Sequence, residues 1–124
     1  MSNIANLVVP PGKPSPDLIV HGAENTAPPA ATVLADTGPL AAAAKLLIVC
    51  NWGADDNVAT PEIAHRNAAN SADVEVDYPG VPAGASSFVS WFTLAVGERV
   101  VCRNKVAGTA AKVYQAALFA WILP

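Results

Sequence analysis

Short apolar segments separated by turn residues follow one another from residue 32 to the end of the chain and leave little room for helices. The runs are ATVLAD, KLLIVCNW, VATPEIAHR, DVEVDY, SFVSWFTLAV and RVVCRN, with Gly, Pro, Asn or Asp residues between them. Strands of this length at this spacing are typical of all-β sandwiches and barrels. We therefore expect residues 31–124 to form an antiparallel β-sandwich or jelly roll of seven to eight strands.

The last segment, AAKVYQAALFAWIL, is long enough for a helix, and its alanines permit one. No capping box precedes it, and it is rich in β-branched and aromatic residues, which favour strands. We predict a strand here, with room for a kink at the alanines. Within the earlier segment 58–66, Pro61 has no backbone N–H, so this segment is expected at a sheet edge or a bulge.

Six of the eleven prolines fall in the first thirty residues. Because proline cannot donate a backbone hydrogen bond, residues 1–30 are expected to form an extended arm outside any regular sheet. The arm also carries apolar side chains that favour burial. We expect these to dock on a neighbouring subunit, with folding back onto the same domain or a loose arm as alternatives. They are Leu7, Val8, Val9, Leu18, Ile19 and Val20.

The chain offers little catalytic or metal-binding chemistry. Alternation over 73–78 places Val74 and Val76 on one side and three carboxylates on the other. Alternate strand residues lie about 6.5–7 Å apart, which is wide for one calcium ion, so we expect an acidic face that meets solvent or a partner. His65 is expected to be a surface or hydrogen-bonded structural residue. No zinc spacing, nucleophile elbow or phosphate loop is present, so we expect no enzyme, metal or cofactor.

Charge and cysteine content narrow the cellular setting and the partners. A net charge of -3 argues against nucleic-acid binding, and no apolar run is long enough to span a membrane. Without a secretory signal, synthesis is expected in the cytoplasm, where Cys50 and Cys102 would be buried free thiols. Four of the seven basic residues lie in the last quarter of the chain. They are expected to pair with acids in the same sheet or to meet an acidic patch on the next subunit.

Several motifs together resemble the small β-sandwich head-decoration, or cement, proteins of tailed bacteriophages. They are RNAANSADVEV, VPAGASSF, GERVVC and GTAAKVYQAALFAWIL. The resemblance implies a structural protein that binds the outer surface of a phage head and stabilises it by clamping neighbouring coat subunits. Its partner would be the major capsid protein lattice, and the protein itself would be a homo-oligomer, either a dimer or a trimer, made in the host cytoplasm.

In that setting the six apolar arm residues would anchor the protein to the capsid. Trp91, Arg99 and Arg103 would be the contacts made by the folded domain. An outward-facing Trp91 also suits a sugar. The alternatives are therefore a carbohydrate- or receptor-binding β-sandwich module and a component of the phage tail or baseplate.

Overall fold

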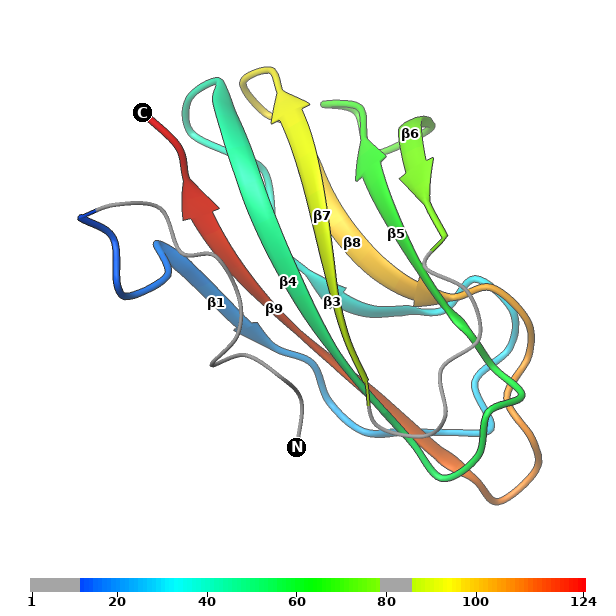
Figure 1. Cartoon of the computed structure of the whole chain (residues 1–124). Coiled ribbons are helices and arrows are strands. Elements are labelled where there is room, and N and C mark those ends of the chain that lie inside the picture. Colours follow the sequence, from blue (N-terminus) through cyan, green and yellow to red (C-terminus); the bar gives the residue numbers. More distant parts are fainter. Residues whose placement is uncertain (1–11, 79–85) are drawn as a thin grey trace.

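The computed structural model describes residues 12–78 and 86–124, and within them it contains nine strands and no helix. The strands form two antiparallel sheets that pack face to face (Figure 1). Sheet A has the order β1 (Leu18–His21), β9 (Val113–Ile122), β4 (Ala44–Ala54) and β7 (Ser86–Leu94), and β2 (Asn25–Thr26) also pairs with β9. Sheet B has the order β3 (Val33–Asp36), β8 (Arg99–Asn104), β5 (Pro61–Arg66) and β6 (Asp73–Asp77).

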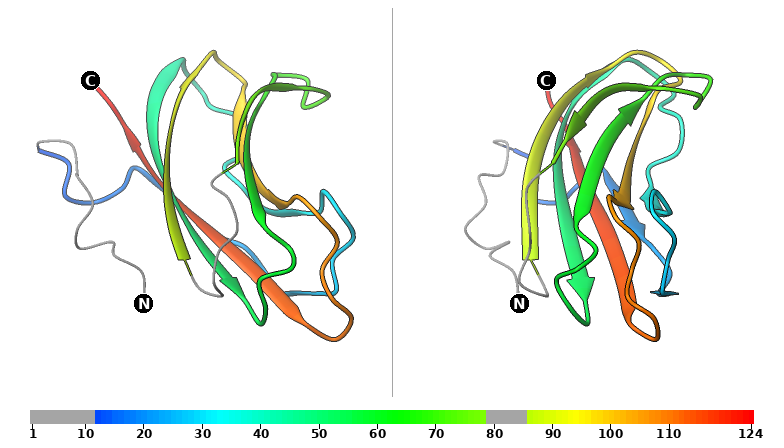
Figure 2. Two further views of the ribbon diagram at one scale, coloured as in Figure 1. Left: turned by 45° about the vertical axis from the view of Figure 1, so that its right-hand side comes forward. Right: turned by 90° about the vertical axis from the view of Figure 1, so that its right-hand side faces the viewer.

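The strand pairs are nested along the chain. The outermost pair joins β1 to β9. Inside it, β3 pairs with β8, β4 with β7 and β5 with β6. Figure 2 shows the resulting two layers, with β4, β7 and β9 in one and β5 and β8 in the other. The expected all-β sandwich is confirmed. The structure has more strands than expected because the N-terminal segment contributes β1 and β2.

The core lies between the sheets and is built from alternate residues of each strand. Leu46, Ile48 and Cys50 of β4 face Ile63 of β5 and Cys102 of β8, and all five are fully buried. At one end of the core, the Trp52 and Tyr114 rings lie 6.3 Å apart between centroids. Burying such side chains stabilises a fold by about 1.5–3 kcal/mol each.

Gly22 directly follows β1 and lies close to the backbones of β9 and β3. The Gly22 amide donates to the Ala116 carbonyl at 2.9 Å, and a Cβ atom on Gly22 would lie 1.8 Å from the Leu34 carbonyl oxygen. Only glycine fits between these two strands, so this close approach depends on the absence of a side chain.

The prediction that residues 1–30 stay outside any regular sheet is wrong for β1 and β2. Residues 18–21 contain no proline and pair with β9, where Leu18 and Val20 pack against the core. After β2, the buried Asn104 side chain donates to the Pro29 carbonyl at 2.8 Å. This hydrogen bond holds Pro28 and Pro29 against the domain. Leu7, Val8 and Val9 lie outside the described residues.

Two other predictions concern Pro61 and the last segment of the chain. Pro61 does not make β5 an edge strand, because it is the first residue of that strand, and β5 lies between β8 and β6. The last segment is a strand, as predicted. Its register with β4 is continuous from Tyr114 to Ile122, so the alanines introduce no break.

Candidate functional site

The outer face of sheet A carries two rows of apolar side chains. Residues that are directly opposite in neighbouring strands share a face, so the register defines these rows. We call this surface the apolar face. Its first row is Trp121, Leu47 and Trp91, and its second is Ile19, Phe119, Val49 and Val89. Polar and small residues occupy the neighbouring rows, namely Lys45 and Thr93 on one side, and His21, Ala117, Asn51 and Ser87 on the other.

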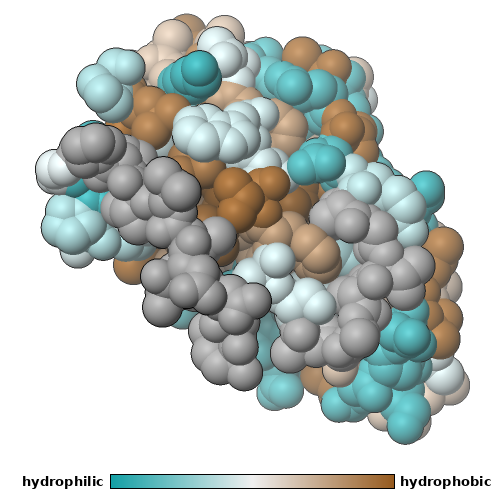
Figure 3. Space-filling model, viewed as in Figure 1, coloured by the Kyte–Doolittle hydropathy of each residue, from teal (hydrophilic) through white to brown (hydrophobic). Residues whose placement is uncertain are grey.

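The centre of the apolar face is buried, and its margins are exposed. Leu47, Val49 and Trp121 form a cluster separate from the main core, and each is at most 5% exposed. At the margin, Trp91 is 54% exposed and Val89 is 42% exposed. Figure 3, which shows the same side as Figure 1, has hydrophobic side chains gathered in the middle of this side. Contiguous exposed apolar side chains with a polar rim mark interaction surfaces.

The Trp121 indole adds a polar feature to the apolar face. Its Nε1–H is buried and has no hydrogen-bond acceptor among the residues that the structure describes. A buried donor without a partner costs about 1–3 kcal/mol, so an acceptor supplied by a bound partner would be stabilising.

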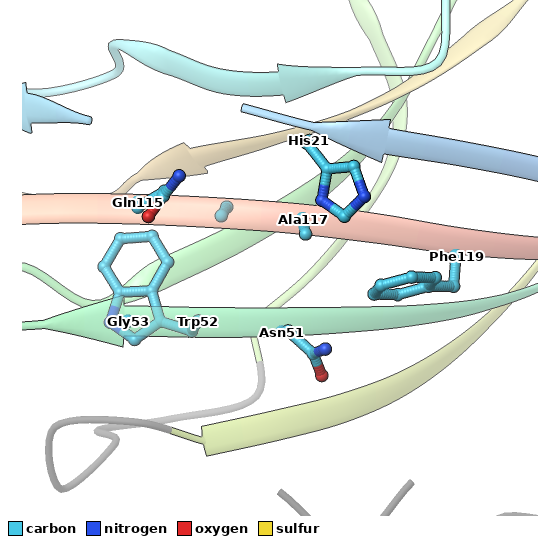
Figure 4. A pocket seen from close by; sticks show the side chains of 8 residues that line it. His21, Asn51, Trp52, Gly53, Gln115, Ala117 and Phe119 are labelled. Atoms are coloured by element: carbon cyan, nitrogen blue, oxygen red, sulfur yellow. The ribbon is translucent and has the colours of Figure 1, made fainter. Parts of the chain in front are cut away.

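A hollow lies beside the apolar face, where the polar row begins. His21 of β1, Asn51 of β4 and Phe119 of β9 surround it (Figure 4), and Gln115 and Gly53 complete its wall. The His21 ring meets the Phe119 ring edge-on, with centroids 5.9 Å apart. The Gln115 amide donates to the Gly22 carbonyl at 2.8 Å, so its orientation is fixed. The hollow therefore combines an aromatic ring with side-chain amides.

The outer face of sheet B carries charges that are paired within the sheet. Arg103 donates to both oxygens of Asp73, at 3.0 and 2.7 Å, and also to Glu62. Arg66 donates to Asp73 at 2.7 Å. The hydrogen bonds from Arg103, followed by those from Arg66, lower the pKa of Asp73 to about 2. In turn, Asp73 raises the pKa of the Arg103 guanidinium.

Arg99 and Arg103 therefore do not share a site with Trp91. Arg99 donates to Asp36 at 3.0 Å within sheet B, and both arginines lie on the opposite side of the sandwich from the apolar face. Of the two alternatives for the basic residues, Arg99 and Arg103 show pairing inside one sheet, whereas the Lys105 ammonium lies 4.0 Å from the centroid of the Tyr78 ring. Trp91 does face outward, as the alternation in SFVSWFTLAV predicted.

The carboxylates of β6 differ from the prediction of an acidic face turned to solvent or a partner. Asp77 contacts the buried Ser90 hydroxyl of β7, and Asp73 is bound by the arginines. The Glu75 side chain keeps 49% of its surface exposed, and Val74 and Val76 are exposed as well, at 54% and 45%. Glu75 and Asp77 lie over polar groups of β5 and β7, which they satisfy, whereas Asp73 follows the register shift between β5 and β6 and joins the arginines on the outer face.

His65 is hydrogen-bonded, and it is only 2% exposed. Its Nδ1 lies 3.0 Å from a Glu75 oxygen and its Nε2 lies 2.8 Å from a Glu98 oxygen. A ring protonated on both nitrogens donates to both carboxylates. The pKa of Glu98 is lowered, mainly by the Ala95 backbone N–H and next by His65. This arrangement ties β5 to β6 and to the turn before β8.

Cys50 and Cys102 meet in the core. Their sulfur atoms lie 3.4 Å apart, one on each sheet, and both are free thiols with no exposed surface. The contact with Cys50 and burial raise the pKa of the Cys102 thiol.

In residues 12–78 and 86–124, no three His, Cys, Asp or Glu side chains lie close enough together to hold a metal ion. The same part of the chain has no helix that could cross a membrane.

Four members of the apolar face were not predicted as site residues from the sequence, namely Leu47, Val49, Phe119 and Trp121. The signal was present in the run LLIVC at 46–50, because a strand that is apolar on both sides must be covered on both sides.

Comparison of the chain with protein families, with characterised proteins and with solved structures finds no match.

Proposed function

We propose that the protein is a structural virion protein that decorates the outer surface of a tailed-phage head and holds neighbouring coat subunits together. The observation that carries this proposal is the apolar face, with Trp91 and Val89 exposed at its margin. The motifs that resemble head-decoration proteins support the same function.

We also infer that the sandwich is a jelly roll, on the basis of its nested strand pairs. Leaving out the two-residue β2, eight strands form the pairs β1–β9, β3–β8, β4–β7 and β5–β6, divided between two sheets. A long hairpin rolled up in this way is the jelly-roll arrangement, which is used by viral capsid and lectin domains. Because one fold serves many functions, the jelly roll supports the proposal and does not decide it.

The apolar face would act through many weak contacts. Burying the exposed parts of Trp91, Val89 and Ile19 against a coat subunit contributes about 1.5–3 kcal/mol for each fully buried side chain. Repetition over a symmetric lattice multiplies a modest contact through avidity. A protein that binds the expanded lattice better than the immature one stabilises the expanded form by mass action.

Binding to purified expanded heads of the phage that encodes the chain tests the proposal. We expect Val89→Ser, on the apolar face, to weaken co-sedimentation with heads. Val76→Ser is the matched control, because Val76 is similarly exposed but lies on the outer face of sheet B. Equal binding by both variants and the unmodified protein would remove the apolar face from the mechanism.

The contribution of the N-terminal segment needs a deletion that ends before the described residues. Removing residues 1–22 would delete β1 and the close approach at Gly22, whereas removing residues 2–11 leaves both intact. If Leu7, Val8 and Val9 anchor the protein, the short deletion weakens head binding while the domain stays folded. Full head binding by that variant would exclude these residues as anchors.

The hollow beside the apolar face favours a second candidate, a carbohydrate-binding module. An aromatic ring next to oriented amides, here Phe119 with Asn51 and Gln115, is suited to stacking and hydrogen bonding with a sugar. This function predicts a signal on a glycan array that is lost in Phe119→Ala and retained in Val89→Ser. A map of the virion separates head decoration from a tail or baseplate location by the position of the density.

A further inference from the structure

The edge strands of the two sheets differ in how well they are protected against pairing with another chain. Natural edge strands are kept short, charged, bulged or proline-bounded. The strand β1 has four residues and follows Pro14 and Pro16, and β3 has four residues and a register shift. The strand β6 carries three carboxylates in five residues. Three of the four edges are thus protected.

The fourth edge, β7, has none of these features. It contains nine residues, SSFVSWFTL, without a charge, a proline or a glycine. Its register with β4 is continuous from Ser86 to Leu94, so no bulge turns the strand away. On its other side, no backbone hydrogen bond to β7 is present within the described residues. This edge is therefore a long template for one more strand.

We propose that a second copy of the chain occupies this edge, so that β7 pairs with β7 of its partner in antiparallel orientation about a twofold axis. Such an interface is isologous, which means that the same surface of both copies is in contact. An antiparallel pair of two identical edge strands meets this requirement, provided that their side chains do not repel one another. The protein carries a net charge of -3, and an edge without charges lets two copies approach without placing like charges side by side.

The neighbouring side chains fit a second copy. Val89 and Trp91 project from β7 on the apolar face, so twofold pairing sets them beside their counterparts and makes one continuous apolar face from two copies. The Asp77 carboxylate of β6 accepts a hydrogen bond from Ser90 of β7 and is held inward. The pairing does not depend on the identity of the larger assembly that the apolar face contacts.

Sedimentation of the isolated full chain over a wide concentration range tests this interface. We expect a monomer–dimer equilibrium that Val89→Lys weakens about tenfold or more, because it brings like charges to the paired edge. Ile19→Lys is the matched control, since Ile19 is in the same row of the apolar face but on the opposite edge strand. Circular dichroism checks that both variants are folded.

Hydrogen exchange of the unmodified protein provides a second readout that does not require a variant. Alternate β7 amides point away from β4, and these amides should become protected only at concentrations where the dimer forms. A monomer at every concentration, a trimer, equal weakening by Ile19→Lys, or a dimer without new protection in β7 would each overturn the proposal. Head binding is measured separately, so failure of the dimer leaves the proposed function to its own test.

Discussion

Replacing Asp73 with Asn tests how far the charge network on sheet B stabilises the fold. Asp73 accepts hydrogen bonds from Arg103 and Arg66, and its folded pKa of about 2 lies below the ordinary value of 3.8. A carboxylate with a depressed pKa adds stability above its unfolded pKa and loses it as the pH falls through the folded value. The contribution of Asp73 is therefore present above about pH 4 and is lost between about pH 4 and pH 2.

The magnitude follows from the two pKa values. Their difference corresponds to about 2.4 kcal/mol without screening, at about 1.4 kcal/mol per pH unit. Because 30% of the Asp73 side chain is exposed, solvent and salt reduce this figure, and we expect a loss of about 1–2 kcal/mol at pH 7. In the variant Arg103 keeps Glu62 as a partner and Arg66 keeps Asn70, so neither arginine is left without an acceptor.

Urea unfolding of both proteins from pH 7 to pH 2 measures this contribution. The difference in the free energy of unfolding should be largest at neutral pH, shrink below pH 4 and decrease at high salt. Glu24→Gln is the control, because Glu24 is exposed and makes no hydrogen bond to the described residues, yet its replacement removes the same charge. A difference for Asp73→Asn that stays constant across the pH range would refute the reasoning.

Three further predictions concern the core and the close approach at Gly22. Gly22→Ala should lower the free energy of unfolding by about 3 kcal/mol or more, measured by heat or urea, because the new Cβ meets the Leu34 carbonyl. Gly53→Ala is the control and should change stability little, because the nearest atom to its Cβ is 3.9 Å away. His65→Ala should cost about 2–4 kcal/mol in the same assay, since it leaves Glu75 and Glu98 without their shared partner, and His21→Ala at the surface should have a small effect. Cys50 and Cys102 should react with a thiol reagent only after unfolding, because burial removes access and raises the pKa of Cys102; rapid labelling of the folded protein would contradict this.

The strands that could be predicted from the sequence are those with a local pattern. Residues 46–50 are continuously apolar, the β-branched and aromatic residues of 113–122 favour a strand, and 73–77 alternate. The strand β1 could not be found in this way, because it is only four residues long between prolines and its partner β9 is about a hundred residues away. Its stability comes from pairing and from packing of Leu18 and Val20, which are tertiary effects.

Alternation also separates the two faces of a strand without saying which one is inside. In β6 the valines face outward and the carboxylates face His65, Ser90 and the arginines. A carboxylate can replace an apolar side chain at such an edge because polar partners on other strands satisfy it. Those partners lie 7 to 30 residues away along the chain. For the apolar face, the outward direction of Trp91 could be predicted, but its alignment with Leu47 and Trp121 depends on the register of three strands.

The nested strand pairs determine the order in which the molecule can be completed during synthesis. The innermost pair, β5 with β6, is separated by a short turn and can form as soon as both strands have left the ribosome, whereas Leu18 of β1 waits for Ala120 of β9. Until then β4 also lacks one of its two neighbours, and the buried side chains of sheet A remain open to water and to other chains. Folding should therefore be slow, because the β1–β9 pair is distant in sequence, and aggregation is most competitive in the interval before β9 is added.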